Sequence, residues 1–236
     1  MSTALRRVGL IGGMSFESTV VYYRLLNEAI RQARGGLSSA DLVMHSVDFA
    51  PIAAMQTAGQ WDEAGQALAQ AAQGLEKAGA QAMLICTVTM HLVADAVAEA
   101  VDVPLIHVID ETAFALKRAG CRRPLLLATR YTMEQGFYQT HMARHDVEVM
   151  VPDAQARKEV HAIIFDELCQ GVVSDASRQI LLTIIEAARA QGADSVILGC
   201  TEVGLILDPD ALILPGFDSA VIHVQAAARF ALGQDA

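Results

Sequence analysis

Short apolar runs alternate along the chain with longer segments in which apolar residues recur at helical spacing. The apolar runs lie at residues 7–12, 40–49, 80–87, 103–109, 122–129, 145–152, 194–201 and 212–218. Helical spacing marks residues 18–34, with Ser18 as the expected N-cap, and residues 62–80, 90–99, 157–171 and 176–193. Continuous apolar strands separated by helices are typical of a parallel sheet covered on both faces. The pattern therefore predicts an α/β fold.

The same pattern starts again in the second half of the chain. The segment "GAQAMLICTV" from Gly79 aligns without a gap with "GADSVILGCT" from Gly192. In this alignment the apolar residues of the two runs coincide, and Thr87 pairs with Cys200. The repeat predicts two similar α/β domains with parallel sheets, related by pseudo-two-fold symmetry.

A second, weaker match supports the repeat and suggests the domain boundaries. Pro104 in "VPLIHVIDETA" and Pro215 in "ILPGFDSAVIH" stand at corresponding places. We expect an N-terminal domain of residues 1–110 with 215–236 and a second domain of residues 111–214. Ligands of open α/β sheets bind beyond the carboxyl ends of the strands. An active site in the cleft between the domains is therefore expected, with Thr87 and Cys200 on opposite walls.

Charge and hydropathy exclude several classes of partner. The chain has 27 acidic and 17 basic residues, and its basic residues are scattered. A nucleic-acid partner is not expected, because binding to phosphates needs clustered lysine and arginine. No run approaches the roughly 18 apolar residues of a membrane span, and the N-terminus lacks a signal-peptide pattern. We expect a cytoplasmic protein without a membrane partner.

The four cysteines point away from a structural metal site. Cys86, Cys121, Cys169 and Cys200 show no CxxC spacing, so no metal site is expected. Disulfides are not expected in a reducing compartment, and at least one thiol is a candidate reactive group. Because strand side chains alternate between faces, Cys86 and Thr87 should point in opposite directions. We interpret Cys86, Cys121 and Cys169 as packing residues.

Several ordered motifs together resemble one enzyme superfamily. They are "GLIGGMSFESTVVYYRLLNEAI", "HSVDF", "CTVTMH", "LLATRYTMEQGFY" and "LGCTEVGLIL". The chain resembles the cofactor-independent aspartate/glutamate racemase superfamily over essentially its whole length, and most closely the broad-specificity amino-acid racemases. The resemblance implies two α/β domains, no cofactor, a small amino acid or carboxylate as substrate, and a homodimer.

The resemblance also assigns the acid/base residues. Members of the superfamily use two opposed cysteines, because inverting a stereocentre needs a base on one face of Cα and an acid on the other. Cys200, followed by Thr201 and Glu202, matches the second cysteine motif. Thr87 stands where the first cysteine is usual, and Val88 stands in place of an asparagine. Since a threonine hydroxyl is a poor base, the resemblance implies directional activity with Cys200 as the principal acid/base.

Further candidates come from the turns that follow the other apolar runs. The turn Gly13, Met14 and Ser15 is expected to cradle a substrate carboxylate with backbone N–H groups. Thr89 matches the superfamily motif as a substrate-binding residue. Thr129 and Thr132 open the equivalent turn of the second half, where one is expected to meet the ligand.

Three further residues lie near these turns, and their roles are less specific. His91 fits a packing role as well as a catalytic one, and His223 fits a residue that tunes a nearby thiol. Asp218 is interpreted as a helix cap.

Substrate specificity and reaction type leave alternatives open. The arginine and lysine that resembling aspartate-specific proteins use for the distal carboxylate are not evident in "SVDFAPIAA" and "LCQG". This favours neutral or mixed amino acids, although Gln56 or Arg130 could serve a polar side chain. A single-cysteine decarboxylase of the malonate type is one alternative. A catalytically weak protein that binds a small carboxylate is the other, because Val88 cannot form the hydrogen bonds of an asparagine.

Overall fold

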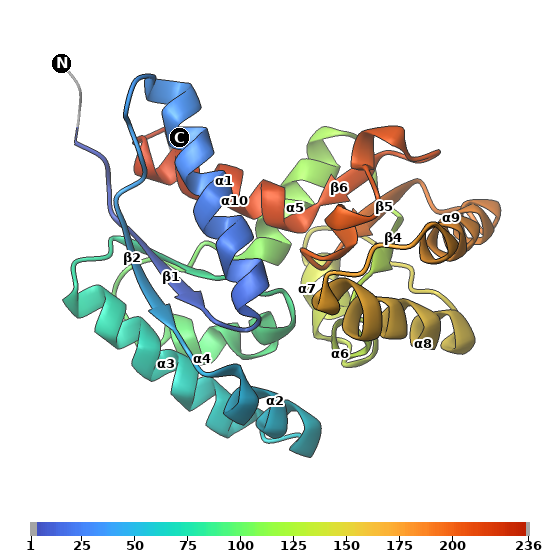
Figure 1. The fold of residues 1–236 in the computed structure, drawn as a ribbon, viewed down its shortest axis with the longest axis horizontal. Coiled ribbons are helices and arrows are strands. Elements are labelled where there is room, and N and C mark those ends of the chain that lie inside the picture. Colours follow the sequence, from blue (N-terminus) through green and yellow to red (C-terminus); the bar gives the residue numbers. More distant parts are fainter. Residues whose placement is uncertain (1–3, 235–236) are drawn as a thin grey trace. The chain divides into compact units, whose positions relative to one another are not determined.

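Residues 4–234 are described by a computed structural model, in which the chain forms two α/β units (Figure 1). The first unit contains the chain up to His107 and again from His223 onward, and the second unit is Val108–Ile222. Among the described residues, no helix is both long and apolar enough to cross a membrane.

The first unit is built on a parallel sheet with the strand order β2-β1-β3. A single bridge from Met83 to Leu105 extends the sheet beyond β3. Its strands are β1 (Val8–Gly12), β2 (Leu42–Ser46) and β3 (Ala82–Ile85). Its helices are α1 (Phe16–Arg34), α2 (Phe49–Ala58), α3 (Trp61–Lys77), the 3₁₀ helix η1 (Thr89–Val93) and α4 (Ala94–Ala98).

Helices cover both faces of this first sheet, as the continuous apolar strands require. All residues of β1 and β3 are buried, and Figure 1 shows α1 and α3 on opposite sides of the sheet. Leu68, Ala72 and Leu75 of α3 pack with Ile11 and Met83 in one apolar core. Burying such side chains stabilises the fold by roughly 1.5–3 kcal/mol for each large residue. This core fixes the ends of β1 and β3, where the candidate site residues lie.

The second unit repeats this architecture. Its parallel sheet has the order β4-β5-β6, and a bridge from Leu125 to Met150 extends it beyond β4. The strands are β4 (Pro124–Leu127), β5 (Ser195–Leu198) and β6 (Gly216–Asp218). The α-helices are α5 (Val108–Arg118), α6 (Arg130–Glu134), α7 (Phe137–Ala143), α8 (Ala154–Ala162) and α9 (Asp175–Ala190), and α10 (Ser219–Ala231) continues into the first unit. Shorter turns are η2 (Ile163–Glu167, a π-helical turn) and the 3₁₀ turns η3 (Leu168–Gln170), η4 (Val203–Leu205) and η5 (Pro209–Ala211).

The strand pairing confirms the internal repeat at the level of individual residues. In the first unit the N–H of Cys86 donates to the carbonyl of Ile11 at 2.9 Å. In the second unit the N–H of Gly199 donates to the carbonyl of Leu127 at 2.8 Å. The residue that follows each of these is Thr87 in one unit and Cys200 in the other.

The proline match is confirmed in the same way. The carbonyl of Pro104 accepts a bond from Met83 at 2.9 Å, and that of Pro215 accepts from Val196 at 2.9 Å. Met83 and Val196 stand four residues after Gly79 and Gly192 respectively. The predicted fold class, two similar α/β units with parallel sheets, is therefore confirmed.

Several predicted elements differ from the structure. The N-cap of α1 is Ser15 instead of Ser18, whose backbone N–H donates to the Ser15 hydroxyl at 3.4 Å. The predicted strands at 103–109 and 145–152 reduce to the single bridges at Leu105 and Met150. The helix predicted at 90–99 is split into η1 and α4, and the helix predicted at 157–171 is split into α8, η2 and η3. Helices α2 and α5 were not predicted, and for α10 only the cap residue Asp218 was.

Candidate functional site

The candidate residues of the first unit follow β1 and β3, two neighbouring strands that run in the same direction. Gly13, Met14 and Ser15 follow β1, and Thr87, Val88 and Thr89 follow β3. Parallel strands place their carboxyl ends at one edge of the sheet, where ligands of such folds bind. The structure therefore brings both groups of predicted residues to the same edge of this sheet.

The turn after β1 is held by hydrogen bonds within the chain. Gly13 has φ +91°, and a Cβ atom there would collide with the backbone of Val47, so only glycine fits. The Gly13 N–H donates to Oγ1 of Thr19 at 2.8 Å, and that hydroxyl donates to the Ser15 carbonyl at 3.0 Å. The Gly13 amide thus shapes the turn, and it is already engaged where the sequence suggested a carboxylate contact. Met14 is buried and Ser15 is half-buried.

Thr87 differs in exposure from its neighbours after β3. Thr87 is partly exposed, whereas every other residue from Ala82 to His91 is buried. Cys86 is 1% exposed, and its burial raises the pKa of its thiol far above the usual range. The prediction that Cys86 is a buried packing residue is confirmed. Val88 and Thr89 are also buried, so Thr87 is the side chain of this loop best placed to meet solvent or substrate.

A buried histidine network supports this loop. His91 Nδ1 lies 2.9 Å from the Thr87 carbonyl, and since a carbonyl only accepts, Nδ1 carries the proton. By the same reasoning, His223 donates from Nε2 to the Ile106 carbonyl at 2.7 Å. His223 Nδ1 therefore accepts from the Tyr22 hydroxyl at 3.0 Å. His91 therefore supports the backbone at Thr87, and His223 supports the backbone at Ile106.

Burial keeps both histidines of this network neutral. Burial is the main cause that lowers the pKa of His223 to about 4, and the nearby His107 adds to it. His91 has its pKa lowered first by burial and then by His107 and His223. The ring centroids of His91 and His107 are 4.7 Å apart, and those of His91 and His223 are 5.6 Å apart. Protonating His91 or His223 near neutral pH would therefore be costly.

In the second unit, Cys200 follows β5 and forms a hydrogen bond with a buried carboxylate. Its Sγ donates to Oε2 of Glu202 at 2.7 Å, and the Thr201 hydroxyl donates to the same oxygen at 2.7 Å. Glu202 is 6% exposed, whereas Cys200 is partly exposed. Burial raises the pKa of the Cys200 thiol, and the negative charge of Glu202 raises it further. The resting thiol is therefore protonated, with a proton acceptor in direct contact.

The threonines after β4 serve the local structure. Thr129 is the N-cap of α6, and its hydroxyl accepts from the Thr132 backbone N–H at 3.4 Å. Thr132 is fully buried, with its hydroxyl 3.2 Å from that of Thr129. Of the two, Thr129 is the residue with access to a ligand, because Thr132 is enclosed.

Asp218, at the end of β6, caps a helix as predicted. Its Oδ1 accepts from the backbone N–H groups of Ala220 and Val221 at 2.9 and 3.1 Å. Burial raises the pKa of this carboxyl, although the two N–H donors oppose the shift. The carboxylate therefore caps the N-terminus of α10, which begins at Ser219.

The two polar residues considered for side-chain specificity are both engaged locally. Gln56 is buried, and its amide nitrogen lies 3.0 Å from the sulfur of Met90. The Arg130 guanidinium lies over the Tyr131 ring, 5.6 Å from its centroid. Neither arrangement resembles a charged clamp for a distal carboxylate.

Sequence reasoning did not foresee the contact between Cys200 and Glu202. It also did not foresee the network that links Tyr22, His91 and His223. The only sequence signal for the network is that two of these residues are histidines within otherwise apolar segments. Their hydrogen bonds join residues 201 and 117 positions apart, which no local pattern reveals.

Comparisons with known proteins agree with this arrangement. The chain is 44% identical to a candidate Asp/Glu racemase from Yersinia pestis of known crystal structure, with a TM-score of 0.91 over 97% of this chain and 100% of that one. It is 33% identical to an aspartate racemase homologue from Pyrococcus horikoshii OT3, with a TM-score of 0.86 over 96% and 99% of the two chains.

Two further matches concern sequence alone. The broad specificity amino-acid racemase RacX of Bacillus subtilis (strain 168) is 26% identical over 161 residues, which are 67% of this chain and 68% of RacX. A family model for Asp/Glu/hydantoin racemases matches residues 11–227, a span that contains the second unit, most of the first unit and every candidate residue described above. The chain belongs to the Asp/Glu/hydantoin racemase family.

Proposed function

We propose that this protein is a cofactor-independent amino-acid racemase or epimerase in which Cys200 and Thr87 act on opposite faces of the substrate Cα. The observation that carries the proposal is their equivalence. Each directly follows a residue whose N–H donates to a carbonyl of the neighbouring strand, β1 at 2.9 Å in one unit and β4 at 2.8 Å in the other. Membership in a racemase family supports the reaction type.

Cys200 is the base of the proposed reaction, and Glu202 is its proton acceptor. The thiol passes its proton to the carboxylate 2.7 Å away, and the resulting thiolate removes the α-proton of the substrate. Glu202 then releases the proton that it accepted to solvent, which restores the resting state. The Thr201 hydroxyl, which donates to the same oxygen, stabilises the carboxylate before the transfer. Because desolvation and Glu202 hold the pKa of the thiol high, the thiolate forms only transiently and is a strong base when it does.

Thr87 is the proton donor on the opposite face. Its hydroxyl gives a proton to the planar carbanion and is reprotonated from solvent. A hydroxyl is a far weaker acid than a thiol, so the reverse role, abstraction of an α-proton by an alkoxide, is slow near neutral pH. The enantiomer whose α-proton faces Cys200 is therefore the better substrate.

The substrate range is broad or confined to non-acidic amino acids. Gln56 and Arg130 were considered for a polar side chain of the substrate. Gln56 bonds to Met90, and Arg130 lies over the ring of Tyr131. Val88 is apolar and buried beside Thr87, so it offers no hydrogen bond to the substrate. We assign contacts with the α-carboxylate and α-amino groups to Ser15, Thr89, Thr129 and the Thr201 backbone.

The experiment that tests the proposal is α-proton exchange in D2O. Both enantiomers of the common amino acids are incubated with the protein, and α-deuterium is followed by NMR or mass spectrometry. Exchange is expected for at least one neutral amino acid. It should fall by about 10²–10⁴-fold in Cys200→Ala, the size of a general acid/base contribution. Cys169→Ala is the matched control, since it removes a thiol of the same unit and should leave exchange intact.

Three outcomes would contradict the proposal. Full exchange in Cys200→Ala would remove Cys200 from the reaction. Thermal stabilisation by amino acids without any exchange would identify a binding protein instead of an enzyme. Release of CO2 from a substituted malonate, again without exchange, would favour a decarboxylase.

A further inference from the structure

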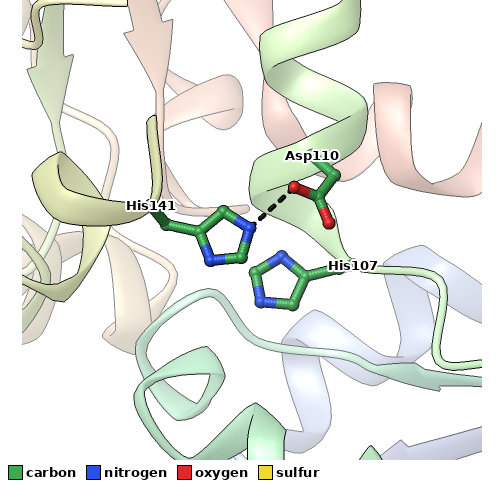
Figure 2. Close-up of side chains that lie close together, drawn as sticks. All are labelled: His107, Asp110 and His141. Atoms are coloured by element: carbon green, nitrogen blue, oxygen red, sulfur yellow. Dashed lines mark hydrogen bonds and ion pairs between the residues drawn. The ribbon is translucent and has the colours of Figure 1, made fainter. Parts of the chain in front are cut away.

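The second unit contains a cluster of two histidines and a carboxylate that the proposed reaction does not use. Asp110 lies in the first turn of α5, His141 lies in α7, and His145 lies just beyond the end of α7. The Nε2 atoms of both histidines lie 2.6 Å from the same oxygen, Oδ1 of Asp110. Figure 2 shows His141 reaching from α7 towards Asp110 on α5. His107, also drawn there, precedes Asp110 by three residues in the chain.

The two imidazoles are arranged as a pair. His141 lies in the last turn of α7, and His145 follows it by four residues, just past the end of that helix. Their rings are nearly parallel, with an interplanar angle of 28° and centroids 6.1 Å apart. The ring of Phe114 packs edge-on against His145, with centroids 5.2 Å apart. The side chains of His141, His145 and Asp110 are 20%, 22% and 34% exposed, so an ion can reach them from solvent.

The donor set matches the preferences of divalent transition metals. Two imidazole nitrogens and one carboxylate oxygen form a typical ligand set for Zn²⁺, and imidazole also suits Ni²⁺ and Cu²⁺. At bond lengths of about 2.0–2.1 Å and a tetrahedral angle, ligand atoms lie about 3.3 Å apart. The present distances of 2.6 Å between Asp110 Oδ1 and the two Nε2 atoms are shorter than this, so an ion can enter only when the carboxylate and the two rings move apart.

The proton balance of such binding is simple. The Asp110 oxygen only accepts when ionised, so each histidine now carries its proton on Nε2. Metal binding at Nε2 requires each proton to move to Nδ1 by exchange with solvent.

We propose that Asp110, His141 and His145 form a binding site for one divalent transition-metal ion of the zinc type. The ion replaces the two hydrogen bonds to Asp110 Oδ1 and ties the start of α5 to the end of α7. Its role is structural: it stabilises the second unit without entering the reaction at Cys200.

Titration with metal tests this site directly. Zn²⁺ is added to the metal-free protein by calorimetry, and Co²⁺ is added with visible absorption as the readout. One ion per chain is expected, with Co²⁺ bands typical of nitrogen and oxygen ligands and without the sulfur-to-metal absorption that a thiolate would give. Zn²⁺ should also raise the melting temperature.

Variants separate this site from other metal binding. His141→Gln and His145→Gln can still donate a hydrogen bond to Asp110, and they should weaken Zn²⁺ binding by more than about tenfold. His45→Ala removes an exposed histidine of β2 and should leave binding unchanged. The α-proton exchange rate should be the same in all three variants. Circular dichroism checks that each variant is folded.

Three results would overturn the inference. One is the absence of Zn²⁺ binding at millimolar concentration. Another is binding that survives in both His141→Gln and His145→Gln. The last is a Co²⁺ spectrum dominated by thiolate ligands, which would place the ion at a cysteine.

Discussion

The loops that follow β3 and β5 occupy equivalent places in the two units but carry different chemistry. The loop after β3 presents a hydroxyl, Thr87, and is supported by the buried, neutral His91. The loop after β5 presents a thiol, Cys200, in contact with the buried carboxylate of Glu202. Since both loops begin from the same strand register, the difference lies in the side chains. Only the second loop contains a proton acceptor next to its acid/base group.

Removing the charge of Glu202 is expected to have the largest effect on this comparison. In Glu202→Gln the thiol loses its proton acceptor, so α-proton exchange should slow by about 10²-fold. The same change removes a cause that raises the pKa of Cys200, so the pKa should fall. The thiol should then react with iodoacetamide faster at neutral pH, although catalysis is slower. If exchange and alkylation both slow down, Glu202 acts only by holding the loop in shape.

Restoring a polar residue beside Thr87 is the next test. Val88→Asn adds an amide that can bond the polar groups of the substrate, a gain of about 1–3 kcal/mol. KM for a neutral amino acid should fall by about five- to a hundredfold, because 1.4 kcal/mol corresponds to a factor of ten. Val88→Ala is the matched control, since it removes bulk without adding a hydrogen-bonding group. Equal KM changes in both variants would mean that space at position 88, and not hydrogen bonding, limits binding.

Acid is expected to weaken the first unit through its buried histidines. The pKa of His223 is about 4 in the folded protein, below the usual value of about 6.5. The unfolded state therefore binds more protons, and the stabilising contribution is complete above about pH 6.5 and lost as the pH falls towards 4. His91 shifts in the same direction. Tyr22, His91 and His107 are the titratable groups that face His223.

Urea unfolding at pH 7 and pH 4.5 measures this effect. From the two pKa values, His223 should account for about 2–3 kcal/mol of the loss in unfolding free energy over this range. In His223→Gln the side chain cannot titrate. Between pH 7 and pH 4.5 the unfolding free energy of this variant should therefore fall by about 2–3 kcal/mol less than that of the unaltered protein. A loss of equal size in both proteins would mean that other groups cause the acid sensitivity.

Much of the fold could be predicted because its strongest signals are local. The runs that form β1, β3, β4 and β5 are buried on both faces, so they read as continuous apolar segments. The apolar runs at residues 103–109 and 145–152 were predicted as full strands. In the structure each forms only a single bridge, at Leu105 and Met150, at the edge of its sheet. Pro104 has no N–H and limits pairing there. Helix α5 was missed because its first residues, Val108 and Ile109, continue an apolar run and hide the helical spacing.

In the candidate site, too, the features with a local sequence signal could be predicted and the long-range contacts could not. The equivalence of Thr87 and Cys200 follows from the sequence repeat, since the alignment from Gly79 and Gly192 matches the strand register. The bond from Cys200 to Glu202 could not be predicted, because the direction of the Glu202 side chain depends on the buried environment behind the loop. The same holds for Asp110, which lies more than 30 residues from the histidines that it binds.

The unequal roles of Thr87 and Cys200 are tested most directly by initial rates of α-deuterium incorporation for each enantiomer of one substrate. In the unaltered protein, the enantiomer facing Cys200 should exchange at least about tenfold faster than its mirror image, because an alkoxide is a far less accessible base than a thiolate. In Thr87→Cys, which supplies a thiol on the other face, the slower rate should rise towards the faster one. Equal rates for both enantiomers before the change, or no gain for the slower enantiomer after it, would contradict the account.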